Sequence, residues 1–210
     1  MKTLVYLLLA AFLATAGCVG TEQTAEKDEG QGTPVGQDLT PPAVVGLFAD
    51  IVNPAVAYPT GIAVTVDGTI FTTDVKANRV VGAYSDETFV EITNLDEPLG
   101  IAVQGDLVYV GSRGRGTVEV YNLTTRKHAF NLQGSFVMPS GIAVAADGTI
   151  YVADSKANTV KVFAADGTET GALAGDFRFP VAVAVNAERV VVGDQGNHRV
   201  VTFALDGSDM

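Results

Sequence analysis

One six-residue pattern occurs four times in this chain at a nearly constant spacing. Each copy begins with proline and ends on Ala-Val, and the copies occupy residues 59–64, 98–103, 139–144 and 180–185. Their third residues, at positions 61, 100, 141 and 182, lie 39, 41 and 41 residues apart. A fixed period of this size is typical of repeat architectures, in which each repeat is one supersecondary unit that packs on its neighbours.

Each repeat has the pattern of four short strands. In the third copy we expect strands at 141–144, 149–153, 159–163 and 169–173, separated by Asp-Gly pairs and by a turn at 154–158. Asp-Gly suits a two-residue hairpin turn, because glycine adopts a positive φ without steric cost. A four-stranded meander cannot bury both of its faces alone, so the copies must pack face to face around an axis. The sequence therefore predicts an all-β fold, a β-propeller of four-stranded antiparallel blades.

Two stretches of the chain resemble NHL repeats. They are residues 139–160 and residues 194–200, the second of which contains Asn-His followed by Arg. The resemblance extends from about Tyr58 to Gly207. It departs from the family pattern at residues 111–116, where Arg and Gly replace the expected Asp and Asn, and at Ala182, which replaces glycine. Reshaped turns are expected in those two blades.

The family's propellers usually have six blades, whereas this chain contains four repeats. Residues 44–51 have the pattern of an outermost strand, and the fourth repeat stops at Asp206-Gly207, where its own outermost strand should begin. We therefore predict a four-bladed ring closed by this N-terminal strand, with an incomplete six-bladed propeller as the alternative. The predicted domains are a signal peptide at 1–17, a lipidated cysteine and disordered tether at 18–42, and the NHL-repeat propeller at 43–210.

The N-terminus has the pattern of a secreted, lipid-anchored protein. A positive residue, Lys2, precedes an apolar run at 4–14, and small residues lead into the only cysteine, Cys18. The run is too short to span a bilayer but has the length of a secretory signal. The segment resembles the lipobox of bacterial lipoproteins, which implies acylation of Cys18, although Thr15 replaces the usual Leu. An ordinary signal peptide with a coincidental Cys18 is the alternative.

The charge of the chain excludes one class of partner. The formal net charge is -11, and the densest basic cluster is only Arg113-Gly114-Arg115. A protein that neutralises nucleic-acid phosphates needs a basic stripe, so we expect no nucleic-acid binding.

One carboxylate recurs in three of the four repeats. Asp74 and Asp154 each begin the pattern Asp-x-Lys-Ala-Asn. Asp194 and Asn197 form a similar but shorter pattern in the fourth repeat. Oxygen ligands of this kind could hold a calcium ion, and a calcium or zinc cofactor is the alternative that we weigh. The favoured interpretation has no cofactor. In it each Asp accepts backbone N–H groups of its own turn and each Asn takes a left-handed conformation.

Three further residues are binding candidates, and no residue is predicted to be catalytic. Arg113 and Arg115 replace the acidic turn signature in an acidic protein, and arginine is frequent at binding hot spots. His198 occupies the family's own histidine position before an apolar strand, which favours a hairpin role. His128 has no motif around it.

The sequence thus predicts an extracytoplasmic β-propeller that is tied to the membrane only by its lipid anchor and binds a protein or carbohydrate partner. By resemblance to sorted lipoproteins, Val19 after the cysteine indicates the outer membrane or cell surface. Two alternatives stay open. One is a metal-dependent lyase or lactonase with its site in the propeller channel, against which the Ile, Ala and Val of the predicted channel strands argue. The other is a structural envelope protein.

Overall fold

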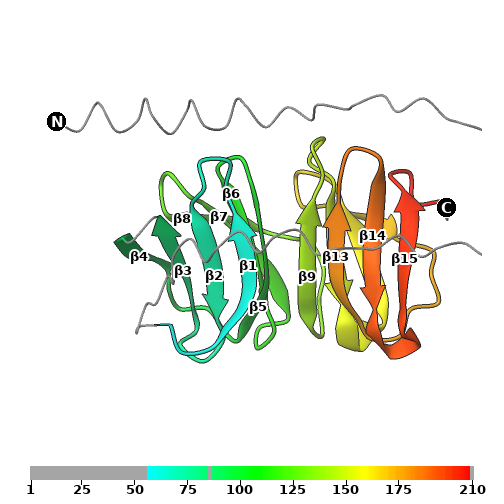
Figure 1. Ribbon diagram of the computed structural model, residues 1–210, viewed down its shortest axis with the longest axis horizontal. Helices are drawn as coiled ribbons and strands as arrows, with labels where there is room; N and C mark the ends of the chain where they lie inside the picture. The colour runs from blue at the N-terminus through cyan, green and yellow to red at the C-terminus, as the bar shows by residue number, and fades with distance from the viewer. Residues whose placement is uncertain (1–55, 85–86, 209–210) are drawn as a thin grey trace, which may run out of the picture. The chain divides into compact units, whose positions relative to one another are not determined.

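The protein folds as four antiparallel sheets that follow one another along the chain (Figure 1). The structure is a computed structural model and describes residues 56–84 and 87–208. The predicted signal peptide, lipidated cysteine and tether, and the predicted strand at 44–51, lie outside these residues. Within the described part, no helix is long and apolar enough to cross a membrane.

Three sheets have four strands and the last has three, and in each sheet the strands pair in chain order. Sheet 1 contains β1 (Pro59–Val64), β2 (Ile70–Asp74), β3 (Arg79–Tyr84) and β4 (Glu87–Ile92). Sheet 2 contains β5 (Pro98–Gln104), β6 (Leu107–Ser112), β7 (Thr117–Asn122) and β8 (Lys127–Asn131). Sheet 3 contains β9 (Pro139–Val144), β10 (Ile150–Asp154), β11 (Thr159–Phe163) and β12 (Glu169–Ala172). Sheet 4 contains β13 (Pro180–Val185), β14 (Arg189–Asp194) and β15 (Arg199–Ala204).

The predicted four-stranded meander is present in the first three repeats, and the fourth has three of its strands within the described residues; the strands expected in the third copy are confirmed to within two residues at each end. The Asp-Gly turns differ from the prediction. Between β9 and β10, Gly148 donates its N–H to the carbonyl of Ala145, and Ala145 donates to the carbonyl of Thr149. Only Gly148 has a positive φ in this loop, so it is a three-residue turn that ends in a left-handed glycine. Asp147 contributes its carboxylate, which accepts the N–H of Thr149.

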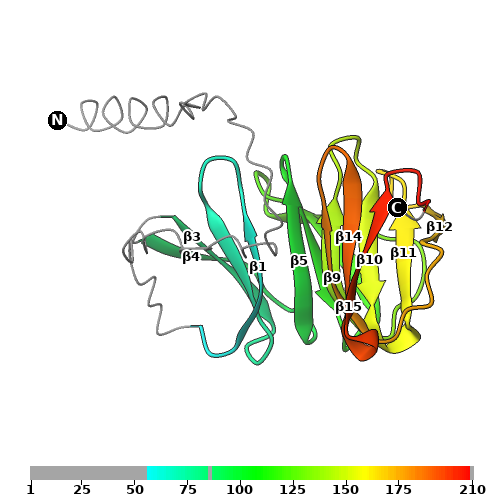
Figure 2. The ribbon, with the colours of Figure 1, turned by 45° about the vertical axis from the view of Figure 1, so that its right-hand side comes forward.

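The first strands of the four sheets lie side by side, in the order β1, β5, β9, β13; Figure 2 shows β1, β5 and β9, and Figure 1 shows β9 beside β13. Between each pair of neighbouring sheets lies one apolar cluster. Phe71, Val80 and Ile101 belong to the cluster of sheets 1 and 2, and Tyr109, Ile142 and Phe163 belong to that of sheets 2 and 3. A third cluster joins sheets 3 and 4. The core is therefore a series of sheet-to-sheet layers, each formed by the alternating apolar residues of its strands.

The repeated glycine is required where two first strands approach most closely. A Cβ at Gly141 would lie 2.9 Å from the Cα of Ala182 in β13, and one at Gly61 would lie 2.4 Å from the carbonyl oxygen of Leu99 in β5. A buried hydroxyl also joins neighbouring sheets near these glycines. Ser155 Oγ, after β10, donates a hydrogen bond to the carbonyl of Pro180 in β13 at 2.6 Å. Small residues and hydroxyls together let the sheets pack closely around the first strands.

The two ends of the series expose apolar side chains that the interior of the series buries. Ile62 of β1 is 69% exposed, whereas its repeat equivalents Ile101 and Ile142 are 6% and 7% exposed. At the other end Val200 of β15 is 70% exposed. Sheet 4 has no fourth strand within the described residues. The strand predicted to complete it falls on residues 44–51, so closure of the ring stays a prediction.

Candidate functional site

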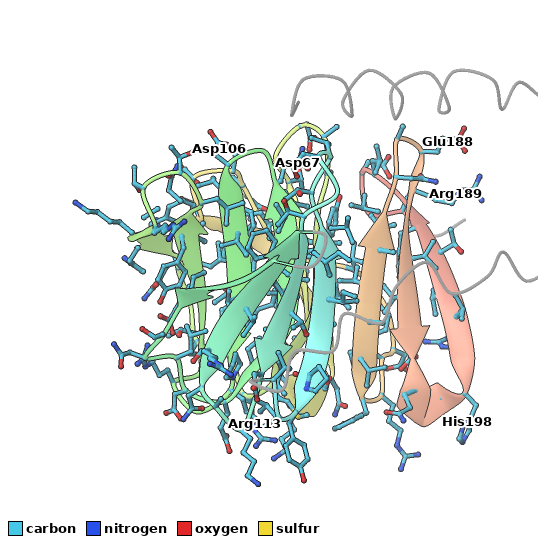
Figure 3. The ribbon with its side chains drawn as sticks, turned by 60° about the vertical axis from the view of Figure 1, so that its left-hand side comes forward. Asp67, Asp106, Arg113, Glu188, Arg189 and His198 are labelled. Atoms are coloured by element: carbon cyan, nitrogen blue, oxygen red, sulfur yellow. The ribbon has the colours of Figure 1, made fainter. Side chains whose placement is uncertain are left out.

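The predicted site residues gather at one end of the sheets. In each meander the loop between the second and third strand lies at this end, which we call the loop face; these loops cover residues 75–78, 113–116, 155–158 and 195–198. The connections from one sheet to the next reach the same end. Figure 3 shows Arg113 and His198 at the loop face and Asp67, Asp106, Glu188 and Arg189 at the opposite end.

Asp74, Asp154 and Asp194 lie below the loop face, in three different sheets, and are at most 1% exposed. Asp154 accepts the N–H groups of Val137 and Met138, at 2.9 and 2.7 Å. Asp74 accepts those of Ala57 and Tyr58 in the same way, and also that of Ala77 in its own turn. Each of these two carboxylates therefore holds the segment that leads into the first strand of its sheet, about 16 residues earlier in the chain.

The carboxylate of Asp194 has a more mixed set of donors. It accepts the N–H of Arg178 at 2.7 Å, the Nδ2 of Asn197 at 2.8 Å and the Nε of Arg199 at 2.9 Å. Burial alone would raise the pKa of Asp194, but these donors and the charge of Arg199 outweigh it, and the net shift is downward. The pKa of Asp74 is also lowered, because backbone donors and the charge of Arg79 outweigh burial.

The second sheet uses a different residue at this position. Ser112 replaces the aspartate, and its Oγ donates to the carbonyl of Asp96 at 2.9 Å and accepts the N–H of Asp96 at 3.3 Å. The hydroxyl thus holds the segment before β5, as the aspartates hold theirs, and the loop that follows it carries the two arginines. The residues of this turn differ, but its backbone does not, because Gly116 donates to the carbonyl of Arg113 as Asn158 donates to that of Ser155; the reshaped turn expected here is not observed.

The fourth residue after each of these anchors has a left-handed backbone in all four sheets. The residues are Asn78, Gly116, Asn158 and His198, with φ between 53° and 64°. Asn158 also accepts the N–H of Phe179 at 2.8 Å, and Asn78 that of Glu97 at 2.9 Å, so both asparagines hold the next inter-sheet connection. In the fourth sheet the left-handed residue is His198 rather than the predicted Asn197, and the His198 side chain is exposed on the loop face.

Arg113 and Arg115 both form ion pairs. Arg113 pairs with Glu97 at 2.7 Å, and this contact raises the pKa of Arg113 and lowers that of Glu97. Arg115 pairs at 3.0 Å with Glu119, which is buried in β7, and also donates to the carbonyl of Asn94. Both guanidinium groups remain partly exposed on the loop face. Glu119 also accepts the hydroxyl of Tyr121. Burial, and to a smaller extent this hydrogen bond, raise the pKa of Tyr121 well above its ordinary value.

Sequence reasoning missed three other cations of this face, Lys76, Lys156 and Arg178. All three are exposed, and none forms an ion pair with another residue of the described part. The Nζ of Lys76 lies 5.0 Å from the ring centroid of Tyr58, whose side chain is 57% exposed. A signal was present in the sequence, since Lys76 and Lys156 stand at the same place in two repeats.

A shallow hollow of about 560 Å³ opens on the loop face between sheets 3 and 4, and Asn158, Asp176, Arg178 and Arg199 line it. Its polar lining residues come from both sheets and from the connection between them. No three His, Cys, Asp or Glu side chains of residues 56–84 and 87–208 are grouped closely enough to hold a metal ion. Asp74, Asp154 and Asp194 are each engaged by hydrogen-bond donors, which is the environment of a structural carboxylate.

Comparison with known proteins agrees with this architecture. Residues 136–163, which include β9, β10 and β11, match the family model described as NHL repeat. No curated protein matches the chain.

Solved structures share the fold at low sequence identity. A chain in the crystal structure of a nidogen/laminin complex is 21% identical with a TM-score of 0.66, over 76% of this chain and 65% of that one. A structure of streptogramin B lyase is 16% identical with a TM-score of 0.63, over 75% and 55%. The computationally designed Ika4 protein is 15% identical with a TM-score of 0.59, over 70% and 91%. This chain thus spans less than two thirds of the length of the first two.

Proposed function

Because the chain carries an NHL repeat within a β-propeller fold of four-stranded blades, we propose that it is a binding module that receives an acidic surface of a protein partner on its loop face. The proposal includes the location predicted from the sequence: an extracytoplasmic protein held to the membrane by a lipid on Cys18. Propellers of this kind serve different functions on one fold, so the site and not the fold carries the argument.

The observation that carries the proposal is the concentration of exposed cations on one end of an acidic protein. The chain has a net charge of -11, yet Lys76, Lys156 and Arg178 stand on the loop face outside any ion pair of the described residues; the charge of Lys156 also acts on Glu97, which Arg113 already pairs. The opposite end carries the exposed acidic turns of Asp67, Asp106 and Glu188 (Figure 3). Such a separation of charge orients an approaching acidic partner and speeds its association.

Two features make the loop face suitable for a protein partner. Exposed Tyr58 beside Lys76 offers aromatic contact area, and tyrosine and arginine are enriched among residues that dominate binding energy. The connections of this face are also held rigidly by the buried carboxylates and by Asn78 and Asn158. A pre-ordered surface loses less entropy on binding. The nidogen/laminin structure gives a propeller-type fold seen with a protein partner, as support by analogy.

The test is affinity capture from a cell-envelope extract with the full chain and two charge-reversed variants. The loop-face variant is Lys76→Glu with Lys156→Glu and Arg178→Glu. The matched control places the same three charge changes at the opposite end, as Arg126→Glu with Lys127→Glu and Arg189→Glu. We expect a captured protein to be lost with the loop-face variant and kept with the control. Equal capture by both variants would refute the loop face as the binding surface.

A further inference from the structure

A separate hollow lies at the end opposite the loop face, between sheets 1 and 2. Its volume is about 350 Å³, and Phe71, Ile92 and Leu123 form its apolar part. Asp67, Asp106 and Arg126 also line it, from the turns β1–β2, β5–β6 and β7–β8. Figure 3 shows Asp67 and Asp106 at this end of the sheets. A concave, mainly apolar site with a few polar groups at its margin is the ordinary form of a small-molecule site.

A hollow also occurs at the equivalent place between two other sheets. Between sheets 3 and 4, a smaller hollow of about 200 Å³ has Tyr151, Leu173 and Leu205 where the first has Phe71, Ile92 and Leu123. That smaller hollow has one acidic lining residue, Asp206, against two in the first.

The two carboxylates of the larger hollow belong to exposed residues that form no ion pair within the described part of the chain. One oxygen of Asp67 accepts the hydroxyl of Thr65 and the N–H of Thr69. These hydrogen bonds, that of Thr65 first, lower the pKa of Asp67, which keeps it ionised near neutral pH. With Arg126 on the same margin, the three side chains sum to one negative charge.

We propose that this hollow binds a small organic cation: a primary ammonium group on an apolar body about the size of a benzene ring. Phe71, Ile92 and Leu123 contact the apolar body, and the ammonium group lies between Asp67 and Asp106. The apolar contacts supply most of the affinity, and the carboxylates supply the preference for positive charge. This site is independent of the loop face, so its failure would leave the proposed function untouched.

The experiment is an NMR titration of the full chain with three probes of one shape and different charge. They are 2-phenylethylammonium, neutral 2-phenylethanol and anionic 3-phenylpropanoate. We expect the ammonium to bind about fivefold more tightly than the alcohol, because two partly exposed carboxylates each contribute a modest amount. Amide shifts should be centred on Thr69, Gly105 and Leu123, and 0.5 M salt should reduce the preference. Equal binding of all three probes, or shifts centred elsewhere, would overturn the proposal.

A pair of variants separates the site from general surface acidity. Asp67→Asn with Asp106→Asn removes both charges and keeps side-chain oxygens that can hold the turns; we expect the ammonium then to bind no better than the alcohol. The matched control, Asp147→Asn with Asp206→Asn, removes two charges from turns at the same end of sheets 3 and 4 and should leave the preference unchanged. If the control loses the preference equally, the attraction comes from overall charge and the proposed site is wrong.

Discussion

The carboxylate of Asp154 accepts the backbone N–H of Met138 at 2.7 Å, across 16 residues of chain. Met138 immediately precedes β9, and Asp154 ends β10, so this contact fixes where the chain enters its sheet. Asp74 makes the equivalent contact before β1 and Ser112 makes it before β5. The repeat is therefore defined as much by a buried hydrogen-bond acceptor as by its apolar residues.

Replacing Asp154 should be costly. Asp154→Ala removes the buried carboxylate that accepts the N–H groups of Val137 and Met138, so we expect a loss of about 1–3 kcal/mol in the free energy of unfolding. Urea denaturation followed by circular dichroism measures this. The control is Asp147→Ala, in an exposed turn with a single backbone contact, which should lose less than about 1 kcal/mol. Equal losses would show that the buried contact is not special.

The lowered pKa values of Asp74 and Asp194 predict acid sensitivity. A carboxyl whose pKa is lower in the folded state than in the unfolded state, about 3.9 there, stabilises the fold above that value. This stabilisation is lost as the pH falls through the lower, folded pKa. Melting temperature should therefore change little from pH 7 to 5 and fall steeply below about pH 4. In Asp74→Asn, which cannot titrate, the fall should be smaller; an unchanged profile would contradict the assignment.

The contacts between first strands predict that two glycines respond differently to the same change. Gly141→Ala places a methyl group 2.9 Å from the Cα of Ala182, and since that atom belongs to the backbone it cannot give way cheaply. We expect a loss of about 1–3 kcal/mol. Gly193→Ala places its methyl at an ordinary 3.5 Å from the Ala182 Cβ and should be neutral or slightly stabilising. Thermal unfolding of both variants tests this, and the reverse order would contradict the packing.

Much of this fold follows from the sequence because it is encoded in local patterns. Alternation of apolar residues predicts the strands, and the repeated Pro-x-Gly at 59–61, 98–100 and 139–141 gives the period of the repeat. The turn at Asp147-Gly148 was predicted with too few residues, since a two-residue and a three-residue hairpin loop can share the same dipeptide. Hydrophobic spacing alone does not distinguish them.

The candidate site was less predictable, because it depends on which loops share one end of the sheets. Arg113 stood out as a departure from the repeat, but its partner Glu97 is 16 residues away, in the preceding connection. Arg178 stands at a variable position of the pattern Gly-x-Phe-x-x-Pro, which occurs at 134–139 and 175–180, and only the fold brings it to the same face as Lys76. The anchoring role of Asp154 toward Met138 is likewise a contact between segments that sequence spacing does not join.

The lipid anchor is the last prediction, and it rests on Cys18, the only cysteine of the chain. If the lipobox resemblance holds, the full chain expressed in a bacterial host should incorporate labelled palmitate and sediment with membranes. Cys18→Ser should abolish the label and release the protein, because no other thiol of the chain can carry a thioether-linked lipid. The matched control is Thr15→Leu, which restores the usual residue of the lipobox and should keep or increase labelling. A labelled Cys18→Ser protein, or an unlabelled parent that is nevertheless cleaved and secreted, would favour an ordinary signal peptide with a coincidental cysteine.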